Sequence, residues 1–587
     1  MQSILNLTNT TKLILATFAF LAVFAFGSGR AHAATLNVTG GCTLPIAINS
    51  VNAGANQSGC TAVISPDSYG TNDTITIPAG TITLSADLPA ITNKSVSIIG
   101  AGKGVTNIDA NGHGGFNTDP DPGPSGARDH VFKDFTIFDA IPMAIGAQFS
   151  GTVTIDGVEV SNSVMGVYVR AIHTIVKDSK ITDNINNNIF GGLITGDFGT
   201  DFAGLSIIPT PVQLSDIPSA DIQDSVISGN SSESAGLYIS TYYQVSGDNV
   251  DSIEVNVERT TIADNIAEKW GGVMIYEEGG TVSEVGTVFT MDAVTVSGNA
   301  VEVATAVPLA DPFQSHPYVS GMIFNGALAN NQNITNLTSA NNIIVNELDD
   351  QLTGAGFVAS LTADSADLTF TNATIVGNEV TQSDPGAFYQ AFVSAGVNAT
   401  FFVDKVAPFV PDITNGASAQ NSLIAGNTRN GVTGSCIQGD KAAFGLSGAI
   451  DLAPVNLGNN ITDDPHCTGY TVVSNILSTL GPLQNNGGPV ETIALLNGSP
   501  AIASGGSVLG VTTDARGVAR PGDCPSVGAF QFEGAVCGAS TPSTPGSGNA
   551  GAPNTGIGAV SPAITIIATS LGLCFIVYAL RKRSALK

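Results

Sequence analysis

A six-residue word recurs through the middle of this chain, starting at positions 179, 225, 260, 294, 373 and 422. Each copy places a β-branched residue three positions before an Asn, with Gly or Asp directly ahead of that Asn. The pairs are Ile181 and Asn184, Ile227 and Asn230, Ile262 and Asn265, Val296 and Asn299, Ile375 and Asn378, and Ile424 and Asn427. β-branched residues pack well on a pleated surface, whereas Gly, Asp and Asn tolerate the left-handed backbone of tight turns. Each copy is therefore interpreted as a short strand that ends in a turn, with its Asp and Asn as turn-makers.

The copies are unevenly spaced, since Asn184, Asn230, Asn265 and Asn299 follow one another at intervals of 46, 35 and 34 residues. Small residues or Gly pairs then open a second apolar stretch, at 191, 235, 271 and 320. A single strand cannot bury its own Ile, so the copies must stack on a shared core with insertions between them. The pattern predicts an all-β, right-handed parallel β-helix of about a dozen coils. A β-sandwich with similar strands is the alternative.

Charge excludes one class of partner. The chain has 20 basic and 48 acidic residues, and six of the basic residues lie in the two terminal segments. The remaining 14 basic residues give the central part a net charge of −34. Nucleic-acid binding requires a positive surface, so we expect no nucleic-acid partner.

Both ends carry targeting signals. Lys12 precedes an apolar run over residues 13–27, and Ala31-His32-Ala33 is a small-x-small cleavage site. This is a secretory signal peptide, with the mature chain beginning at Ala34 or Thr35. Residues 563–580 form an apolar stretch long enough to span a bilayer, and a basic cluster, Arg581-Lys582-Arg583, follows it. The sequence therefore predicts an extracellular protein on the cell surface, anchored to the cell wall or plasma membrane by its C-terminus.

A pentapeptide precedes that helix, behind a Ser/Thr/Pro/Gly-rich spacer. Its residues are Ala552, Pro553, Asn554, Thr555 and Gly556. The order of pentapeptide, apolar helix and basic tail resembles the LPxTG sorting signal of Gram-positive-type surface proteins, with Ala552 where that family has Leu. The resemblance implies cleavage between Thr555 and Gly556 and attachment to the cell envelope.

Two further segments resemble known bacterial surface proteins. The segments starting at Cys42, Asp73 and Ser97 resemble the opening of secreted β-helix proteins of the CSLREA type, in which Cys42, Leu44, Ala47 and Ile48 match. Residues 480–505 and 513–532 resemble the choice-of-anchor Q domain. The matching residues there are Gly487, Gly488, Pro489, Ser499, Pro500, Ala501, Asp514, Arg516, Gly517, Arg520, Gly528 and Ala529, with Gln531 where an acidic residue is common. The resemblance implies a surface solenoid and carries no catalytic residue across.

These features divide the chain into six parts. They are a signal peptide (1–33), an N-terminal cap with the first coils (34–110), the β-helix (111–480), a C-terminal cap (481–537), a spacer with the sorting-like motif (538–556), and a transmembrane helix with its basic tail (557–587). Within the cap, Leu44, Ile48 and Val51 have the spacing of a short amphipathic helix. The first strands are expected in 73–91 and 96–102. Pro-rich insertions at 208–220, 303–320 and 402–417 are either binding loops or covers that pack back on the coils.

The cysteines fit export. Cys42 and Cys60, Cys436 and Cys467, and Cys524 and Cys537 form three local pairs, while Cys574 lies in the apolar helix. Six cysteines allow 15 pairings, and we expect the local one. CxxC spacing is absent from the sequence, so metal binding is the lesser alternative.

Candidate chemistry is sparse. Asp178, Asp183, Asp224, Asp264 and Asp292 lie in or beside the repeated words, and His173 lies near them. Carboxylates on neighbouring coils could serve a polysaccharide lyase or glycosidase, but an Asp before a turn Asn usually bonds its own backbone, so these are expected to be structural. Asp119 and Asp121 have ligand-like spacing, but His130 stands at the twelfth position, which excludes an EF-hand and leaves a looser Ca²⁺ site as an alternative.

In the end domain, Asp514, Arg516, Arg520 and Glu533 are expected to form ion pairs that close the cap. We predict no catalytic, cofactor-binding or metal residue. The sequence favours a cell-surface display or adhesion protein that binds an unknown glycan or protein. A surface polysaccharide-active enzyme is the alternative. The oligomeric state and the ligand are not predicted.

Overall fold

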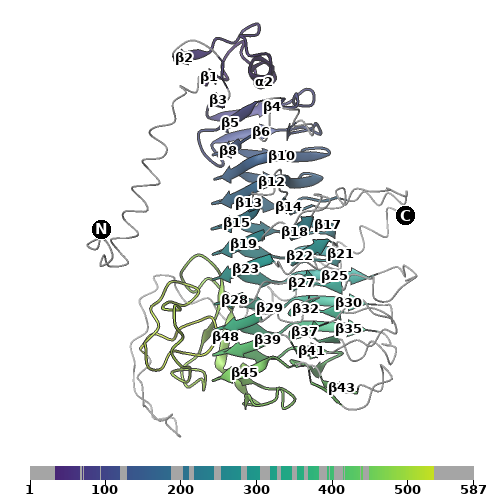
Figure 1. The fold of residues 1–587 in the computed structure, drawn as a ribbon, viewed down its shortest axis with the longest axis vertical. Coiled ribbons are helices and arrows are strands. Elements are labelled where there is room, and N and C mark those ends of the chain that lie inside the picture. Colours follow the sequence, from purple (N-terminus) through teal and green to yellow (C-terminus); the bar gives the residue numbers. More distant parts are fainter. Residues whose placement is uncertain are drawn as a thin grey trace, which may run out of the picture. The chain divides into compact units, whose positions relative to one another are not determined.

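The computed structural model describes residues 33–65, 69–70, 72–92, 94–118, 128–186, 203–209, 217–242, 253–278, 287–303, 318–326, 332–346, 353–361, 368–382, 393–394, 397–401, 414–415, 417–436, 438–440, 449–451 and 453–534. Most of the strands in these ranges pair in parallel with the equivalent strand of the next coil (Figure 1). Sandwich sheets are antiparallel, so this pairing confirms the predicted parallel β-helix and rules out the sandwich.

Antiparallel pairing is confined to five pairs among the described strands. They are β1 (Ala33–Asn37) with β2 (Val63–Ser65), β37 (Val397–Phe401) with β38 (Thr414–Asn415), β41 (Thr428–Arg429) with β42 (Val432–Thr433), β43 (Gln438–Asp440) with β44 (Ala449–Asp451), and β48 (Leu480–Gln484) with β49 (Thr492–Leu495).

Three long sheets run along the stack. Sheet I has 22 strands in two columns, which the long strands β10 (Met143–Asp156) and β12 (Met165–Lys177) join. Besides these two and β1, column Ia contains β3 (Asn72–Thr76), β5 (Ser95–Ile99), β8 (His130–Lys133), β15 (Ser219–Gln223), β19 (Ile253–Glu258), β23 (Thr287–Asp292), β28 (Gln332–Thr335), β33 (Leu368–Thr371), β39 (Ala417–Gln420) and β45 (Val455–Gly458). Column Ib contains β7 (Phe116–Asn117), β14 (Leu205–Pro209), β18 (Leu237–Tyr242), β22 (Val273–Glu278), β27 (Met322–Gly326), β32 (Phe357–Leu361) and β37.

Sheet II has 13 short strands. They are β4 (Gly80–Thr83), β6 (Thr106–Asp109), β9 (Thr136–Phe138), β11 (Glu159–Ser161), β13 (Lys180–Thr182), β16 (Val226–Ser228), β20 (Thr261–Ala263), β24 (Thr295–Ser297), β29 (Thr338–Ala340), β34 (Thr374–Val376), β40 (Leu423–Ala425), β46 (Ile461–Thr462) and β47 (Thr471–Val472). Sheet III contains β17 (Ser231–Ser234), β21 (Ile266–Trp270), β25 (Ala300–Val303), β26 (Tyr318–Val319), β30 (Ile343–Asn346), β31 (Thr353–Gly354), β35 (Glu379–Gln382), β36 (Val393–Ser394), β41 and β42. One coil therefore runs through column Ia, sheet II, sheet III and column Ib, as β15, β16, β17 and β18 do.

The repeated word forms the strands of sheet II. Its β-branched residues stack in register from coil to coil and are at most 1% exposed. The stack also contains Ser339, which lies between Val296 and Ile375. Ser339 belongs to a seventh copy, residues 337–342, which the sequence search missed because a Ser replaces the β-branched residue.

The Asn of each word has a different role from the one predicted. Each Asn is fully buried, and in every copy but the last its Nδ2 donates to Oδ1 of the Asn in the next coil. This ladder runs through Asn184, Asn230, Asn265, Asn299, Asn342, Asn378 and Asn427, with N···O distances of 2.8–3.0 Å. A second Nδ2 bond goes to a backbone oxygen of the preceding coil, as from Asn265 to Ile227 at 3.2 Å. The amide thus satisfies backbone groups that the corner would otherwise leave unpaired.

The residue ahead of each Asn makes the turn, as predicted. Asp183, Gly229, Asp264 and Gly298 have φ values of 57°, 67°, 56° and 63°. Glycine tolerates this left-handed conformation without steric cost, and Asp tolerates it better than most side chains do. The prediction that Asp and Gly make the turns is therefore confirmed. The Asn, predicted as a second turn-maker, instead connects neighbouring coils through buried hydrogen bonds.

Small residues stack where each coil passes from sheet III to column Ib. A Cβ atom added to Gly236, Gly272 or Gly321 would lie 2.0–2.2 Å from a carbonyl oxygen of the next coil. No side chain fits at that distance, which explains the Gly or small-residue pairs before the second apolar stretch. The copy at 191 lies outside the described residues.

The N-terminal cap contains the helix predicted by the sequence. α2 (Leu44–Ala53) buries Leu44, Ile48 and Val51, and Gly54 ends it with φ 62°. β3, β4 and β5 lie where the first strands were expected. A helix across the first coil shields its edge, as a solenoid end requires.

The chain then turns back along sheet II after β47. The short 3₁₀ helix η4 (Ile476–Thr479) leads into the β48–β49 hairpin, and irregular segments follow to residue 534. We call residues 480–534 the lateral cover. Its apolar residues Ile493, Leu495 and Val527 cluster with Val376 and Leu423 of sheet II.

Candidate functional site

The outward face of column Ia is a regular surface that runs along the stack. Alternate residues of a strand point to opposite faces, so the side chains between the buried ones point outward. One outward row runs in register through Asp221, Asn256, Thr290, Asn333, Thr369 and Ser418. Neighbouring strands lie about 4.8 Å apart, so the row presents a polar group at each such step.

Hydrogen bonds order this row. Thr290 Oγ1 donates to Asn256 Oδ1 at 2.8 Å, and Thr371 Oγ1 donates to Asn333 Oδ1 at 3.0 Å. The hydroxyls of Thr369 and Ser418 lie 2.9 Å apart. These contacts fix the side chains before any ligand binds, which lowers the entropy cost of recognition.

A carboxylate cluster occupies one end of this polar row. Asp221 on β15 lies opposite Asn256 on β19. Glu254 and Glu258 stand two residues before and two residues after Asn256, so they flank Asp221 diagonally. Partial burial raises the pKa of Asp221, and the negative charges of Glu254 and Glu258 raise it further, while His173 opposes the shift. His173 Nδ1 lies 3.1 Å from Ser219 Oγ. Asp221 is therefore more readily protonated than an ordinary Asp side chain.

Cations beside this cluster are held in ion pairs. Arg259 contacts Asp224 and Glu258 at 2.7 Å each, and its guanidinium lowers the pKa of Asp224. On the preceding coils, Lys133 and Lys177 both contact Asp156. The face consequently offers hydrogen-bonding groups and negative charge to a ligand, with its positive charges already paired.

The five aspartates expected from the sequence do not form one site. Asp178, Asp183, Asp224 and Asp264 have φ values of 49°, 57°, 49° and 56°, so they lie at coil corners. Partial desolvation raises the pKa of Asp264, whose corner position is otherwise exposed. Asp292 Oδ1 accepts bonds from Thr335 and Asn336.

Sequence reasoning missed Asp221, Glu254 and Glu258. The signal for them was the alternation of apolar and polar residues in β15 (SADIQ) and β19 (IEVNVE). Every second residue of those strands is apolar and buried, which places the acidic ones together on the outer face. The search followed the repeated word instead, and the word belongs to sheet II.

Asp119 and Asp121 of the possible calcium loop lie outside the described residues. His130 itself is a buried residue of β8, and burial lowers its pKa to about 4. Within the described ranges, no group of three His, Cys, Asp or Glu side chains is arranged to hold a metal ion.

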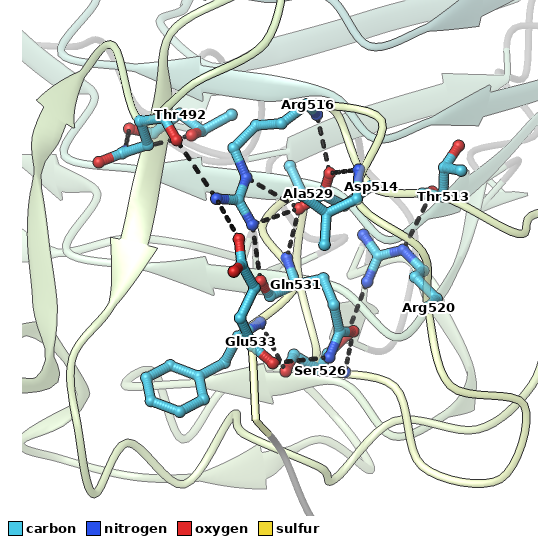
Figure 2. Close-up of polar contacts among 12 residues, drawn as sticks. Thr492, Thr513, Asp514, Arg516, Arg520, Ser526, Ala529, Gln531 and Glu533 are labelled. Carbon is cyan, nitrogen blue, oxygen red and sulfur yellow. Dashed lines mark hydrogen bonds and ion pairs between the residues drawn. The ribbon is translucent and has the colours of Figure 1, made fainter. Parts of the chain in front are cut away.

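The end-domain charges form a network with a buried centre, Arg516 and Asp514, and an exposed member, Glu533 (Figure 2). Arg516 contacts Asp514 at 2.8 Å, and their side chains are 6% and 0% exposed, so this ion pair is more buried than a surface pair. Glu533 lies 3.7 Å from Arg516, whose guanidinium also covers the Phe530 ring at 3.7 Å. Asp514 also accepts bonds from the backbone N–H groups of Arg516, Val518 and Gln531. The pair thus joins two segments of the lateral cover, residues 514–518 and 530–533.

Arg520 joins the lateral cover to the coils. Its Nη2 donates to Asn336 Oδ1 at 3.0 Å and to Gly528 O at 2.8 Å, and Nη1 donates to Ser526 O at 3.0 Å. Burial lowers its pKa to about 10, so the guanidinium stays charged at neutral pH. Its role is therefore anchoring through carbonyl and amide oxygens, and not the direct ion pair expected.

The covered strands differ from the uncovered ones in sequence. β24, β29, β34 and β40 are buried at all three positions, whereas β13 exposes Lys180. Thr295 Oγ1 donates to Glu491 O at 2.6 Å, and the Ala529 N–H donates to Thr374 Oγ1 at 2.9 Å. From Thr295 onward, the outward residues of sheet II are small or apolar. This pattern in the sequence indicates that another segment packs on this part of the sheet.

Two of the three predicted disulfides are confirmed, Cys42–Cys60 and Cys436–Cys467. Cys524 is disulfide-bonded as well, but Cys537 lies outside the described residues. The signal peptide up to His32, the sorting-like motif and residues 563–580 also lie outside the described residues. No helix among the described residues has the length and apolarity needed to cross a bilayer.

Comparisons with known proteins give one structural neighbour. No family model matches the chain, and no curated protein matches it. The A-module of mannuronan C-5 epimerase AlgE6 from Azotobacter vinelandii is similar over 67% of this chain and 91% of its own length, with 12% sequence identity and a TM-score of 0.24.

Proposed function

We propose that this protein is a cell-surface display or adhesion protein that binds a neutral polysaccharide along the outward face of column Ia. The proposal rests on the ordered polar row from Asn256 to Ser418, whose hydroxyl and amide groups match the hydrogen-bonding groups of a sugar chain. Paired cations and a surplus of carboxylates disfavour an anionic polymer.

The proposed setting follows from the sequence. The chain is exported by its signal peptide and held by the motif 552–556 and the apolar stretch after it, in the manner of bacterial surface β-helix proteins with a choice-of-anchor Q domain. Its coils are wound right-handed, as connections between parallel strands almost always are. Mass spectrometry of the surface-attached protein tests the anchor: a chain ending at Thr555 supports sorting, and residues beyond Gly556 refute it.

Binding is tested with the purified secreted protein on a polysaccharide array. Thr290→Arg places a long side chain on the exposed middle of the row and should lower the affinity for a bound neutral glycan at least about tenfold, the equivalent of 1.4 kcal/mol. Ser228→Arg makes the same change on β16 of sheet II and serves as the matched control. Equal binding by both variants would place the ligand elsewhere.

The carboxylate cluster favours a second function, a polysaccharide-active enzyme. Asp221 and Glu254 lie diagonally on adjacent strands, about 8 Å apart at the Cβ atoms from the strand spacing and rise. Asp221, whose pKa burial raises, could act as general acid and Glu254 or Glu258 as base, at a Cβ separation comparable to the carboxyl spacing of inverting glycosidases. New reducing ends that disappear in Asp221→Asn would establish this function. Release that persists in the variant would exclude Asp221 as the acid.

A further inference from the structure

Asp73 is a fully buried carboxylate with an unpaired oxygen. Its Oδ1 accepts bonds from the backbone N–H groups of Ala34 at 2.8 Å and Gly70 at 2.9 Å. Its Oδ2 is buried and has no partner. Lys94 lies close by, but its ammonium donates to the carbonyl oxygen of Gly70 at 2.7 Å. A buried carboxylate normally has a cationic partner, and among the described residues no Lys or Arg side chain pairs with Asp73.

Ala34 lies opposite Asp73 and is itself fully buried. β1 pairs in parallel with β3, with Thr35 opposite Thr74, which places the preceding residues Ala34 and Asp73 side by side. The sequence Ala31-His32-Ala33 is a signal-peptidase site that leaves either Ala34 or Thr35 as the first residue. A cut after Ala33 converts the Ala34 nitrogen from a single N–H donor into an ammonium with three donors, at the position where Asp73 lacks a cation.

We propose that maturation hydrolyses the Ala33–Ala34 peptide bond and that the new α-ammonium of Ala34 forms a buried ion pair with Asp73. A signal peptidase of the membrane would catalyse the step. Water supplies the nucleophile, Ala33 leaves with the new carboxylate, and the Ala34 amine takes up a proton at neutral pH. The ammonium can donate to both oxygens of Asp73 and so completes the cap only after export.

This pairing distinguishes the two cleavage positions that the sequence allows. Cleavage after Ala34 would remove the residue that contacts Asp73 and leave the carboxylate buried without it. The structure therefore favours Ala34 as the first residue. The proposal is independent of the ligand and of the function of column Ia.

N-terminal sequencing of the secreted full chain gives the first test, and Ala34 is the expected first residue. Thr35 as the first residue would overturn the proposal. The second test compares Asp73→Asn in the natural protein and in a variant with Gly-Ser inserted between Ala33 and Ala34, which leaves an extension after cleavage. The natural terminus should lose much more thermal stability on Asp73→Asn than the extended terminus, because only the former then buries an unpaired ammonium. Equal losses in both would refute the ion pair.

A third measurement covers the case in which Asp73→Asn fails to fold. An amine acylating reagent applied to native protein should modify the α-amine of Ala34 at least about tenfold more slowly than the α-amine of the Gly-Ser extension, since burial blocks access of the reagent and the ion pair with Asp73 keeps the amine protonated. Equal rates would overturn the proposal even if the variant cannot be purified.

Discussion

Replacing Asn265 with Ala should destabilise the middle coils more than any neighbouring surface change. Asn265 Oδ1 accepts bonds from the backbone N–H of Asn230 at 3.1 Å and from its Nδ2 at 2.9 Å. Asn265 Nδ2 donates to Asn299 Oδ1 at 2.8 Å and to Ile227 O at 3.2 Å. The substitution therefore removes four hydrogen bonds from a site that solvent does not reach.

The magnitude follows from the donors left behind. Two buried donors on Asn230 lose their acceptor, and each such loss costs about 1–3 kcal/mol, giving roughly 2–6 kcal/mol in total. Asp264→Gly is the matched control, because the sister turns carry Gly229 and Gly298 at the same left-handed position. It should change stability by less than about 0.5 kcal/mol, as surface substitutions usually do.

Hydrogen exchange is the suitable assay, since a solenoid can open locally and one global unfolding energy is then poorly defined. In Asn265→Ala, the Asn230 amide should exchange at least about thirtyfold faster, the equivalent of 2 kcal/mol, while amides of α2 stay unchanged. Unchanged exchange at Asn230, or equal acceleration by Asp264→Gly, would show that the ladder does not stabilise the stack.

Three further predictions concern other parts of the fold. Gly272→Ala should prevent folding or lower the urea midpoint strongly, because its Cβ would meet Gly321 O at 2.0 Å, whereas Gly522→Ala, with no atom within 4 Å, should leave the midpoint unchanged. Arg520→Lys cannot reproduce the guanidinium bonds to Asn336, Ser526 and Gly528, so limited proteolysis should release the lateral cover sooner; an unchanged rate would contradict the anchoring role. The pKa of His130 is lowered by burial to about 4, below the usual 6.5, so unfolding takes up a proton and stability should fall by about 3 kcal/mol as the pH drops from 6.5 towards 4. Denaturant titrations should find that drop reduced in His130→Leu, and a drop of the same size there would refute the assignment.

Sequence patterns predicted the parts of the fold that depend on local chemistry. The left-handed turns were predicted from Asp183 and Gly229, the cap helix from the spacing of Leu44, Ile48 and Val51, and the stacked core from the β-branched residues of the word. These features depend on backbone preference and apolar periodicity, which neighbouring residues reveal.

Contacts between distant residues were not predictable in this way. The Asn ladder depends on side chains 34–49 residues apart, and a buried Asn has the same sequence appearance as a turn Asn. The lateral cover bonds residues up to 196 positions apart, as Thr295 does with Glu491. The Asp221 cluster was missed for a similar reason, since its members come from successive coils and no local motif marks them.

The most direct test of the proposed binding surface is a hydrogen-exchange footprint of the secreted protein with a neutral polysaccharide selected on the array. Protection is predicted in the peptides of β19, β23, β28 and β33, which carry the row from Asn256 to Thr369, and Thr290→Arg should abolish it. Protection confined to sheet III or to the lateral cover, with column Ia unchanged, would contradict the assignment of this face as the ligand site.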